Sequence, residues 1–240
     1  MTDIHVDRRG LLRGLGCCAT LPAVAVLANS ASAQETAIAP IPVPENPTPQ
    51  QALDILKAGN AGFLTDAPYR AADTRERRLE IAAGQKPFAV LVGCSDSRVS
   101  PELLFGRGLG ELFIIRVAGN TVDLTALGSI EYAVAHLGVP LIVVLGHERC
   151  GAVAAAVEVV ENNAIFEGAI GSMVEPIVPA VLSAKGVEGD LLENSVRANV
   201  ERVVARLLTS GVVIENLVEE GKLMVVGARY DLEDGVVEFL

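Results

Sequence analysis

Short apolar runs alternate along this chain with segments whose apolar residues recur at helical spacing. The runs Phe88 to Gly93, Leu112 to Val117 and Pro140 to Gly146 hold few polar residues, which is typical of strands buried on both faces of a parallel sheet. The segment from Leu223 to the end contains a strand, an "EDG" turn at Glu233 to Gly235 and a second strand.

Helical patterns lie between these runs. Thr48 offers an N-cap, Pro49 occupies the first helical position, and Leu53, Leu56 and Phe63 follow at helical spacing. Further helices are expected at residues 101–105 with Ser100 as N-cap, at 125–138, from Gly151 onward and at 190–210. Alternating strands and helices predict an α/β fold, in which a mainly parallel central β-sheet is flanked by helices.

The first 33 residues have the features of an export signal. Arg8 and Arg9 precede an apolar run that ends in the small-residue cleavage pattern Ala31 to Ala33. Adjacent arginines before an apolar run resemble a twin-arginine signal, so a periplasmic or otherwise exported protein is expected, with no membrane attachment after cleavage. The alternative is an uncleaved anchor. Residues 34–47 are interpreted as a Pro-rich linker, and 48–240 as one catalytic domain.

Composition limits the partners of the chain. Its 240 residues carry a net charge of −11, and an acidic protein is poorly suited to neutralising phosphates, so no nucleic-acid partner is expected. Cleavage after residue 33 would leave two cysteines, Cys94 and Cys150, and two histidines, His136 and His147.

Three of these four residues lie in two short loops, "GCSDSR" at Gly93 to Arg98 and "GHERCGA" at Gly146 to Ala152. Each loop follows an apolar run. In open α/β sheets, ligand sites form outside the carboxyl ends of the strands. The loops are therefore expected to face each other across about fifty residues of sequence, as two halves of one site.

Three interpretations of Cys94, His147 and Cys150 remain open. They form a packed group of buried thiols with a hydrogen-bonded histidine, or a disulfide in an oxidising compartment, or a zinc site. A disulfide does not require His147. A structural zinc normally has four protein ligands, whereas three ligands with an exchangeable fourth position are typical of a catalytic zinc.

Asp96 and Arg98 lie two residues apart beside Cys94. A guanidinium can hold a carboxylate through two hydrogen bonds and keep it ionised, which would place an acceptor near metal-bound water. Asp96 could instead be the fourth ligand and exclude that water. A simple ion pair within the loop is the third possibility.

These motifs identify a family resemblance. The two loops, "RVAGN" at Arg116 to Asn120, "GSIEYAVAHLGV" at Gly128 to Val139, and "LKAGNAGF" near the first helix closely resemble the β-class carbonic anhydrases of bacteria. The resemblance extends from about Leu53 to the closing "YDLEDG".

The resemblance implies one zinc per chain, bound by Cys94, His147 and Cys150. It implies that Asp96 accepts a hydrogen bond from zinc-bound hydroxide and that Arg98 holds Asp96. It implies reversible hydration of carbon dioxide to bicarbonate and a proton, and a homodimer or a dimer-based oligomer. In some members of the family the matching aspartate binds zinc at lower pH and inactivates the enzyme.

Two other functions remain as alternatives, namely a zinc hydrolase of carbonyl sulfide or carbon disulfide and a non-catalytic, disulfide-stapled binding protein of the cell envelope. Two thiolate ligands should make metal-bound water less acidic than an all-histidine site would, so activity is expected to rise toward alkaline pH.

Several further residues have open roles. The amide of Gly151 could point toward bound bicarbonate at a helix N-terminus, or this glycine could only permit close backbone approach. His136 and Tyr132 are undecided as proton shuttles. Gly106, Gly108 and Gly110 predict a turn and no nucleotide site.

Overall fold

The computed structural model describes residues 41–65 and 74–240. The export signal expected at residues 1–33 lies outside the described residues, so its assignment stays a prediction. No helix within the described ranges has the length and apolar character needed to cross a membrane.

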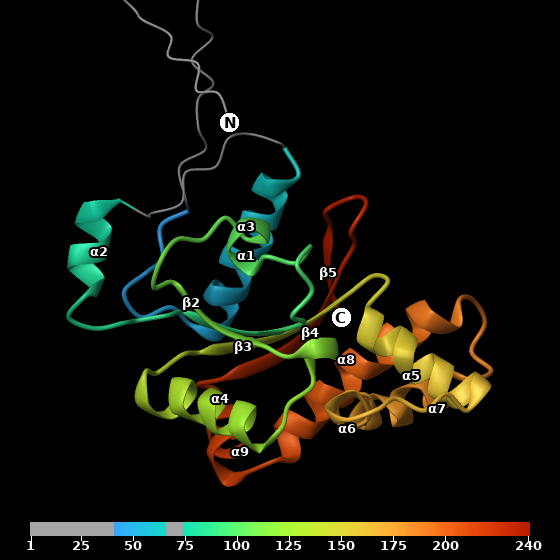
Figure 1. Ribbon diagram of the computed structural model, residues 1–240. Coiled ribbons are helices and arrows are strands. Elements are labelled where there is room, and N and C mark those ends of the chain that lie inside the picture. Colours follow the sequence, from blue (N-terminus) through green and yellow to red (C-terminus); the bar gives the residue numbers. More distant parts are fainter. Residues whose placement is uncertain (1–40, 66–73) are drawn as a thin grey trace, which may run out of the picture. The chain divides into compact units, whose positions relative to one another are not determined.

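A five-stranded sheet forms the centre of the fold (Figure 1). Its order is β2-β1-β3-β4-β5. The first four strands run parallel, and β5 pairs with β4 in the antiparallel direction. The fold class expected from the sequence is confirmed. The strands are β1 (Ala89–Gly93), β2 (Leu112–Arg116), β3 (Leu141–His147), β4 (Met224–Tyr230) and β5 (Val237–Phe239).

Helices cover both faces of this sheet, which explains why the central strands are apolar along their whole length. They are α1 (Pro49–Phe63), α2 (Arg75–Ile81), α3 (Pro101–Leu104), α4 (Leu124–His136), α5 (Gly151–Asn162), α6 (Ala169–Val174), α7 (Val178–Ala184), α8 (Leu191–Thr209) and α9 (Val212–Glu219), with the 3-10 turns η1 (Ala118–Asn120) and η2 (Glu175–Ile177).

The alternation of side chains along a strand assigns the strand residues to two cores. In β1 and β3, Leu91 and Val143 pack against α1 and α3 on one face. Their neighbours Val92 and Val144 pack on the other face, in a core that includes α4, α8 and α9. Figure 1 shows α1 and α3 above the sheet and α4 and α9 below it.

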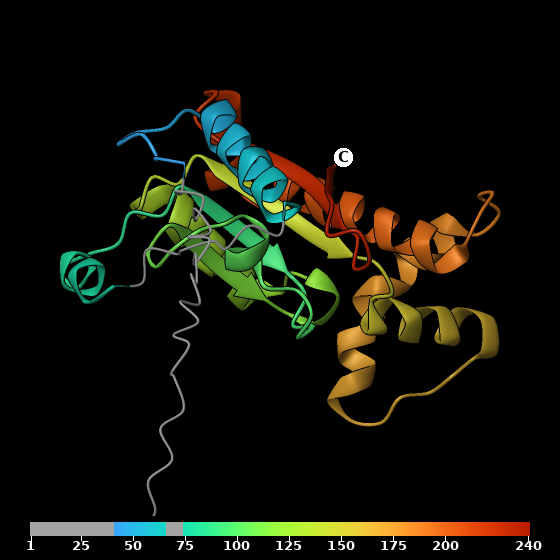
Figure 2. The same ribbon diagram turned by 90° about the horizontal axis from the view of Figure 1, so that it is seen from above.

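A third cluster lies beyond the carboxyl ends of the strands. It joins Cys94 and Cys150 to apolar residues of α5, η2, α7 and α8. In Figure 2, the yellow and orange helices α5 to α7 project from this end of the sheet, while α2 lies at the other. The cysteines are therefore anchored in an apolar layer at one end of the sheet.

Local sequence accounts for the first helix and less well for a later one. Thr48 and Gln51 form a reciprocal capping box at the start of α1, which satisfies two backbone amides that would lack partners. Ser100 occupies the N-cap position of α3, but its side chain makes no capping hydrogen bond. The expected N-cap position is confirmed, without the side-chain hydrogen bond that is typical of a serine there.

The segment 41–47 differs from a free tether. Ile41 and Val43 pack against the core on the α1 side of the sheet, and the carbonyl of Ile41 accepts a hydrogen bond of 3.0 Å from Arg107. Arg107 is only 2% exposed, so it fixes this part of the segment to the body of the fold. A Pro-rich composition excludes regular structure here but does not exclude docking.

Candidate metal centre

The carboxyl ends of two neighbouring strands position three potential ligands. Cys94 directly follows β1, His147 is the last residue of β3, and Cys150 is the N-cap of α5. Since β1 and β3 are adjacent and parallel, the two loops meet at one edge of the sheet, as the sequence predicted.

The three side chains form a buried cluster. Cys94, His147 and Cys150 are 5%, 0% and 1% exposed. One ligand atom from each lies within 4.8 Å of the others, and the two sulfur atoms are 3.9 Å apart. Both cysteines are free.

The histidine ring is oriented by its own loop. The Nδ1 atom of His147 lies 2.8 Å from the carbonyl oxygen of Glu148. A carbonyl only accepts hydrogen bonds, so Nδ1 carries the proton and Nε2 presents a lone pair. Nε2 is buried without a hydrogen-bond partner among the described residues. A buried polar atom without a partner is costly unless it binds a metal.

The donor set fits a zinc ion. Two thiolates at about 2.3 Å from one tetrahedral zinc are separated by roughly 3.8 Å, and the sulfur atoms of Cys94 and Cys150 are 3.9 Å apart. The lone pair on Nε2 of His147 supplies a third donor. The fourth position of such a site would not come from a Cys or His within the described ranges.

The contact between the two thiols shifts their pKa values in opposite directions. The hydrogen bond with Cys150 lowers the pKa of Cys94 to about 4, with further contributions from His147 and from the amide of Gly119. The same shared hydrogen bond and then burial raise the pKa of Cys150. One thiolate is thus stabilised without a metal. A bound divalent cation would stabilise the second thiolate as well.

Asp96 and Arg98 form a two-pronged pair beside the cluster. The Nε and Nη2 atoms of Arg98 donate to Oδ1 and Oδ2 of Asp96 at 2.9 and 2.8 Å. This guanidinium holds the pKa of the Asp96 carboxyl well below its usual range. Asp96 Oδ2 lies 3.8 Å from His147 Nε2, so an ionised carboxylate borders the position where the ligand atoms converge.

Two further residues hold the first loop, and the sequence pattern did not assign them to the site. The amide of Gly119 in η1 donates to Cys94 Sγ at 3.3 Å. Arg116, at the end of β2, donates to the carbonyl oxygens of Cys94 and Asp96 at 2.8 and 2.5 Å. Both belong to "RVAGN", which begins at the last residue of β2, a strand that ends at the same edge of the sheet. The place of this motif at a strand end is the feature of the sequence that could have assigned both residues to the site.

The second loop is fixed by the C-terminal turn. Arg149 adopts a left-handed backbone conformation with φ 51° and pairs with Glu148 and Glu233 at 3.1 and 2.5 Å. The carboxylate of Glu148 accepts a hydrogen bond from the amide of Leu232 at 3.2 Å. The loop bearing His147 and Cys150 is thus attached to residues over eighty positions later.

The remaining candidates lie in different places. Gly151 begins α5, and a Cβ added there would meet no atom within 4 Å among the described residues, so packing does not require a glycine.

His136 and Tyr132 stack on α4 with ring centres 5.4 Å apart. His136 precedes β3 and lies at the opposite end of the sheet from His147. Gly106 and Gly110 have positive φ in the predicted turn.

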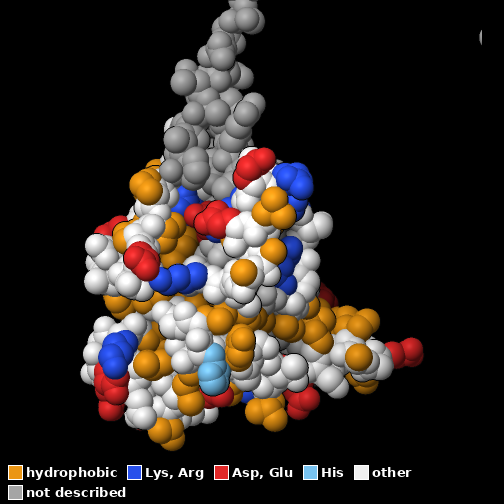
Figure 3. Space-filling model, turned by 90° about the vertical axis from the view of Figure 1, so that its left-hand side faces the viewer, with side chains coloured by type: hydrophobic (Ala, Val, Ile, Leu, Met, Phe, Trp, Pro, Cys, Tyr) orange, Lys and Arg blue, Asp and Glu red, His pale blue; other side chains and the backbone are white. Residues whose placement is uncertain are grey.

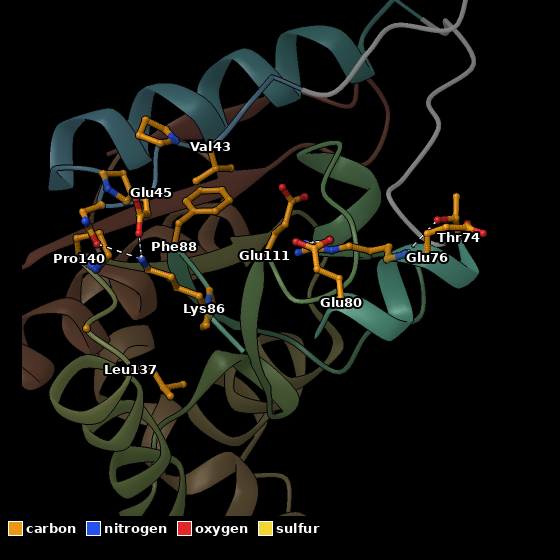
Figure 4. A pocket seen from close by; sticks show the side chains of 16 residues that line it. Val43, Glu45, Thr74, Glu76, Glu80, Lys86, Phe88, Glu111, Leu137 and Pro140 are labelled. Carbon is orange, nitrogen blue, oxygen red and sulfur yellow. Dashed lines mark hydrogen bonds and ion pairs between the residues drawn. The ribbon is translucent and has the colours of Figure 1, made fainter. Parts of the chain in front are cut away.

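A cavity of about 790 Å³ lies at the opposite end of the strands, where Phe88 and Lys86 precede β1. Figure 4 shows Phe88 beside Val43, and Lys86 reaching toward Glu45. Lys86 pairs with Glu45 at 3.9 Å. No cysteine or histidine lines this cavity among the described residues, and the Cys94, His147 and Cys150 group that could hold a metal lies at the other end.

Comparison with known proteins agrees with this geometry. A family model for carbonic anhydrase matches residues 89–237. The chain is similar to carbonic anhydrase 2 of Mycobacterium tuberculosis, with 40% identity over 190 residues that cover 79% of this chain and 92% of that protein. A carbonic anhydrase of Pseudomonas aeruginosa is 40% identical over 168 residues, covering 67% and 76%.

Solved structures show the same likeness. The fold is similar to that of a tetrameric β-carbonic anhydrase from the filamentous ascomycete Sordaria macrospora, with a TM-score of 0.60 and 30% identity. This alignment covers 68% of the present chain and 84% of that one.

Proposed function

The chain belongs to the β-class carbonic anhydrases, and we propose that it hydrates carbon dioxide reversibly to bicarbonate and a proton with one zinc per chain. The observation that carries this proposal is the buried group of Cys94, His147 and Cys150, in which His147 Nε2 has no hydrogen-bond partner among the described residues.

The cluster residues would hold the metal, and the neighbouring pair would direct the reaction. When bound at such a site, zinc supplies a hydroxide nucleophile near neutral pH. Asp96 offers carboxylate oxygens beside the cluster and remains ionised, because Arg98 donates to both oxygens. We assign Asp96 the role of accepting a hydrogen bond from the group at the fourth position. Arg98 has the role of holding Asp96 away from the metal.

The apolar edge of the sheet supports a dimer. Strand β2 has a neighbour on one side only among the described residues, and its residues are partly exposed. Figure 3, which views this side of the molecule, shows hydrophobic side chains in a band across the surface. An unpaired strand edge with apolar surface favours association. Sedimentation should therefore give the mass of at least two chains, and a monomer at micromolar concentration would contradict the proposal.

Export remains a proposal that depends on the sequence alone. A twin-arginine route carries folded proteins, so the two thiolates could bind zinc before they reach an oxidising compartment. N-terminal sequencing of protein recovered from the periplasm should begin at Gln34. Recovery only from the cytoplasm, with residue 1 intact, would overturn this proposal.

The histidines provide a matched test of the activity. His147→Ala removes a proposed ligand, and His136→Ala removes the same ring from the surface of α4. We expect His147→Ala to reduce the hydration rate by at least about 100-fold and His136→Ala to retain most of it. Stopped-flow hydration assays measure both. Equal activity of the two variants would refute the assignment of the site.

A further inference from the structure

A second cavity forms a groove along α8. It has a volume of about 690 Å³ and is bordered by α7, by α8 and by residues 121 and 122, which follow η1. Such a volume is within the usual range for small-molecule sites, about 300–1,000 Å³. Figure 1 shows α7 and α8 side by side, and the two helices are in contact.

Two arginines line this groove without a partner among the described residues. Arg202 and Arg206 lie one helical turn apart on α8, and both are exposed. Neither guanidinium has a hydrogen bond or an ion pair to any residue in the described ranges. Arg197 on the same helix, by contrast, pairs with Glu193 and Glu238. In a chain with net charge −11, two adjacent guanidiniums that have no partner in the described part of the chain are positioned to receive an anion.

The rest of the lining indicates what kind of anion would fit. Val122 and Val203 are buried, and Pro176 and Pro179 provide rigid apolar surface. One carboxylate, Glu201, also borders the groove. A ligand with an apolar body would cover this floor, and guanidinium forks match the geometry of a carboxylate or phosphate.

The groove is connected to the metal cluster by two hydrogen bonds. Asn199, which lines the groove and is 1% exposed, donates to the carbonyl of Gly119 at 2.8 Å. The amide of the same glycine donates to Cys94 Sγ at 3.3 Å. A Cβ at Gly119 would lie 2.5 Å from Ile177 and 3.2 Å from Ala152, so this backbone is tightly enclosed. A displacement of α8 would therefore be transmitted to Cys94 through Gly119.

We propose that this groove binds an organic oxyanion, whose carboxylate or phosphate group is held by Arg202 and Arg206 and whose apolar body lies against the valines and prolines. Occupancy of the groove restrains α8 and thereby the Gly119 amide at Cys94. The proposal of a binding site depends only on the residues that line the groove. Its influence on the metal centre rests on the proposed function.

Binding is tested by titration calorimetry with phenyl phosphate, and with phenol as the uncharged counterpart. We expect phenyl phosphate to bind at low ionic strength with a Kd below about 1 mM and the variant Arg202→Gln/Arg206→Gln to bind at least about 10-fold more weakly. Arg75→Gln removes the same charge from α2, outside the groove, and should bind as the wild-type protein does.

The controls decide between this groove and other anion sites. Equal affinity of the wild-type protein and the double variant would overturn the proposal, because the anion would then bind elsewhere, for example at the metal. Absence of binding up to about 10 mM would also overturn it. Both arginines are exposed, and a circular dichroism spectrum would verify that the variant is folded. If it is not, Arg206→Gln alone serves the same comparison.

The connection to the metal centre has a separate readout. Phenyl phosphate should slow amide hydrogen exchange at Gly119 by at least about 3-fold in the wild-type protein and not in the double variant. Unchanged exchange despite binding would refute the coupling and leave the binding site intact. Neither experiment measures carbon dioxide hydration, so failure of the proposed function would be seen independently.

Discussion

At the scale of single residues, the Asp96–Arg98 pair borders the group of Cys94, His147 and Cys150 that could hold a metal. Both carboxylate oxygens are engaged by one guanidinium at 2.9 and 2.8 Å, while Asp96 Oδ2 lies 3.8 Å from His147 Nε2. In the proposed zinc site, the carboxylate would therefore be close enough to interact with a group at the fourth position, and Arg98 would hold it back from binding there itself.

Arg98→Lys tests this account, since lysine keeps the charge and loses the planar fork. We expect the hydration rate to fall by about 10–100-fold, as is typical for partners of metal ligands, because Asp96 is then held at one oxygen only. Zinc content should stay at one per chain. Arg75→Lys on α2 is the control, and a hydration rate equal to that of the wild-type protein in both variants would contradict the account.

Gly119 is tightly packed, and its amide also donates a hydrogen bond to Cys94. Its φ of 68° lies in the left-handed region, and an added Cβ would lie 2.5 Å from Ile177. We expect Gly119→Ala to lower the free energy of unfolding by about 1–3 kcal/mol.

Gly128 provides the comparison, because it lies within α4 and a Cβ there would meet no atom within 4 Å among the described residues. Gly128→Ala should raise the free energy of unfolding by up to about 1 kcal/mol, the difference in helix propensity. Urea unfolding at neutral pH measures both variants. A Gly119→Ala variant as stable as the wild-type protein would show that the close contact relaxes freely.

At the scale of elements, the closing turn stabilises the second loop, and Asp231 organises that turn. Its carboxylate accepts hydrogen bonds from the amides of Glu233 and Asp234, both at 3.0 Å. It also pairs with Arg229 at 2.7 Å. The amide of Asp234, followed by the side chain of Arg229, lowers the pKa of Asp231.

A carboxyl group whose pKa is lowered by folding stabilises the native state above its unfolded pKa, and this contribution is lost as the pH falls toward the folded value. Asp231→Asn should therefore reduce the free energy of unfolding by about 1–2 kcal/mol at pH 7. The difference from the wild-type protein should shrink below about pH 4, the usual range of aspartate. Asp234→Asn, in the same turn, is the control. A difference independent of pH would exclude this mechanism.

Element boundaries show what the sequence can and cannot determine. The parallel strands were predictable because continuous apolar runs require burial on both faces. The helix expected from Gly151 onward had no predicted end before the helix at 190–210, whereas α6, η2 and α7 follow α5 as separate elements in this region. Prolines at 176 and 179 remove backbone donors there, but where each helix stops depends on packing against α5 and α8.

At the scale of the whole molecule, the meeting of Cys94, His147 and Cys150 was predictable from the sequence, and the contacts that support them were not. Parallel strands bring their carboxyl ends together, so Cys94 and His147 could be placed in one site from the sequence. The amide of Gly119 and the ion pairs of Arg149 could not, because they depend on backbone conformations and on contacts with the C-terminal turn. The groove arginines of α8, which have no partner within the described ranges, give no signal in the sequence, since Arg202 and Arg206 lie in an ordinary amphipathic pattern.

The most direct test is the metal content of the purified mature protein, together with a count of free thiols after denaturation in chelator. The account predicts about one zinc per chain and two titratable thiols, which would join the loops of Cys94 and Cys150 in one metal site. No zinc and no free thiols would contradict it, because the two cysteines would then be a disulfide and the isolated protein would lack its proposed catalytic centre.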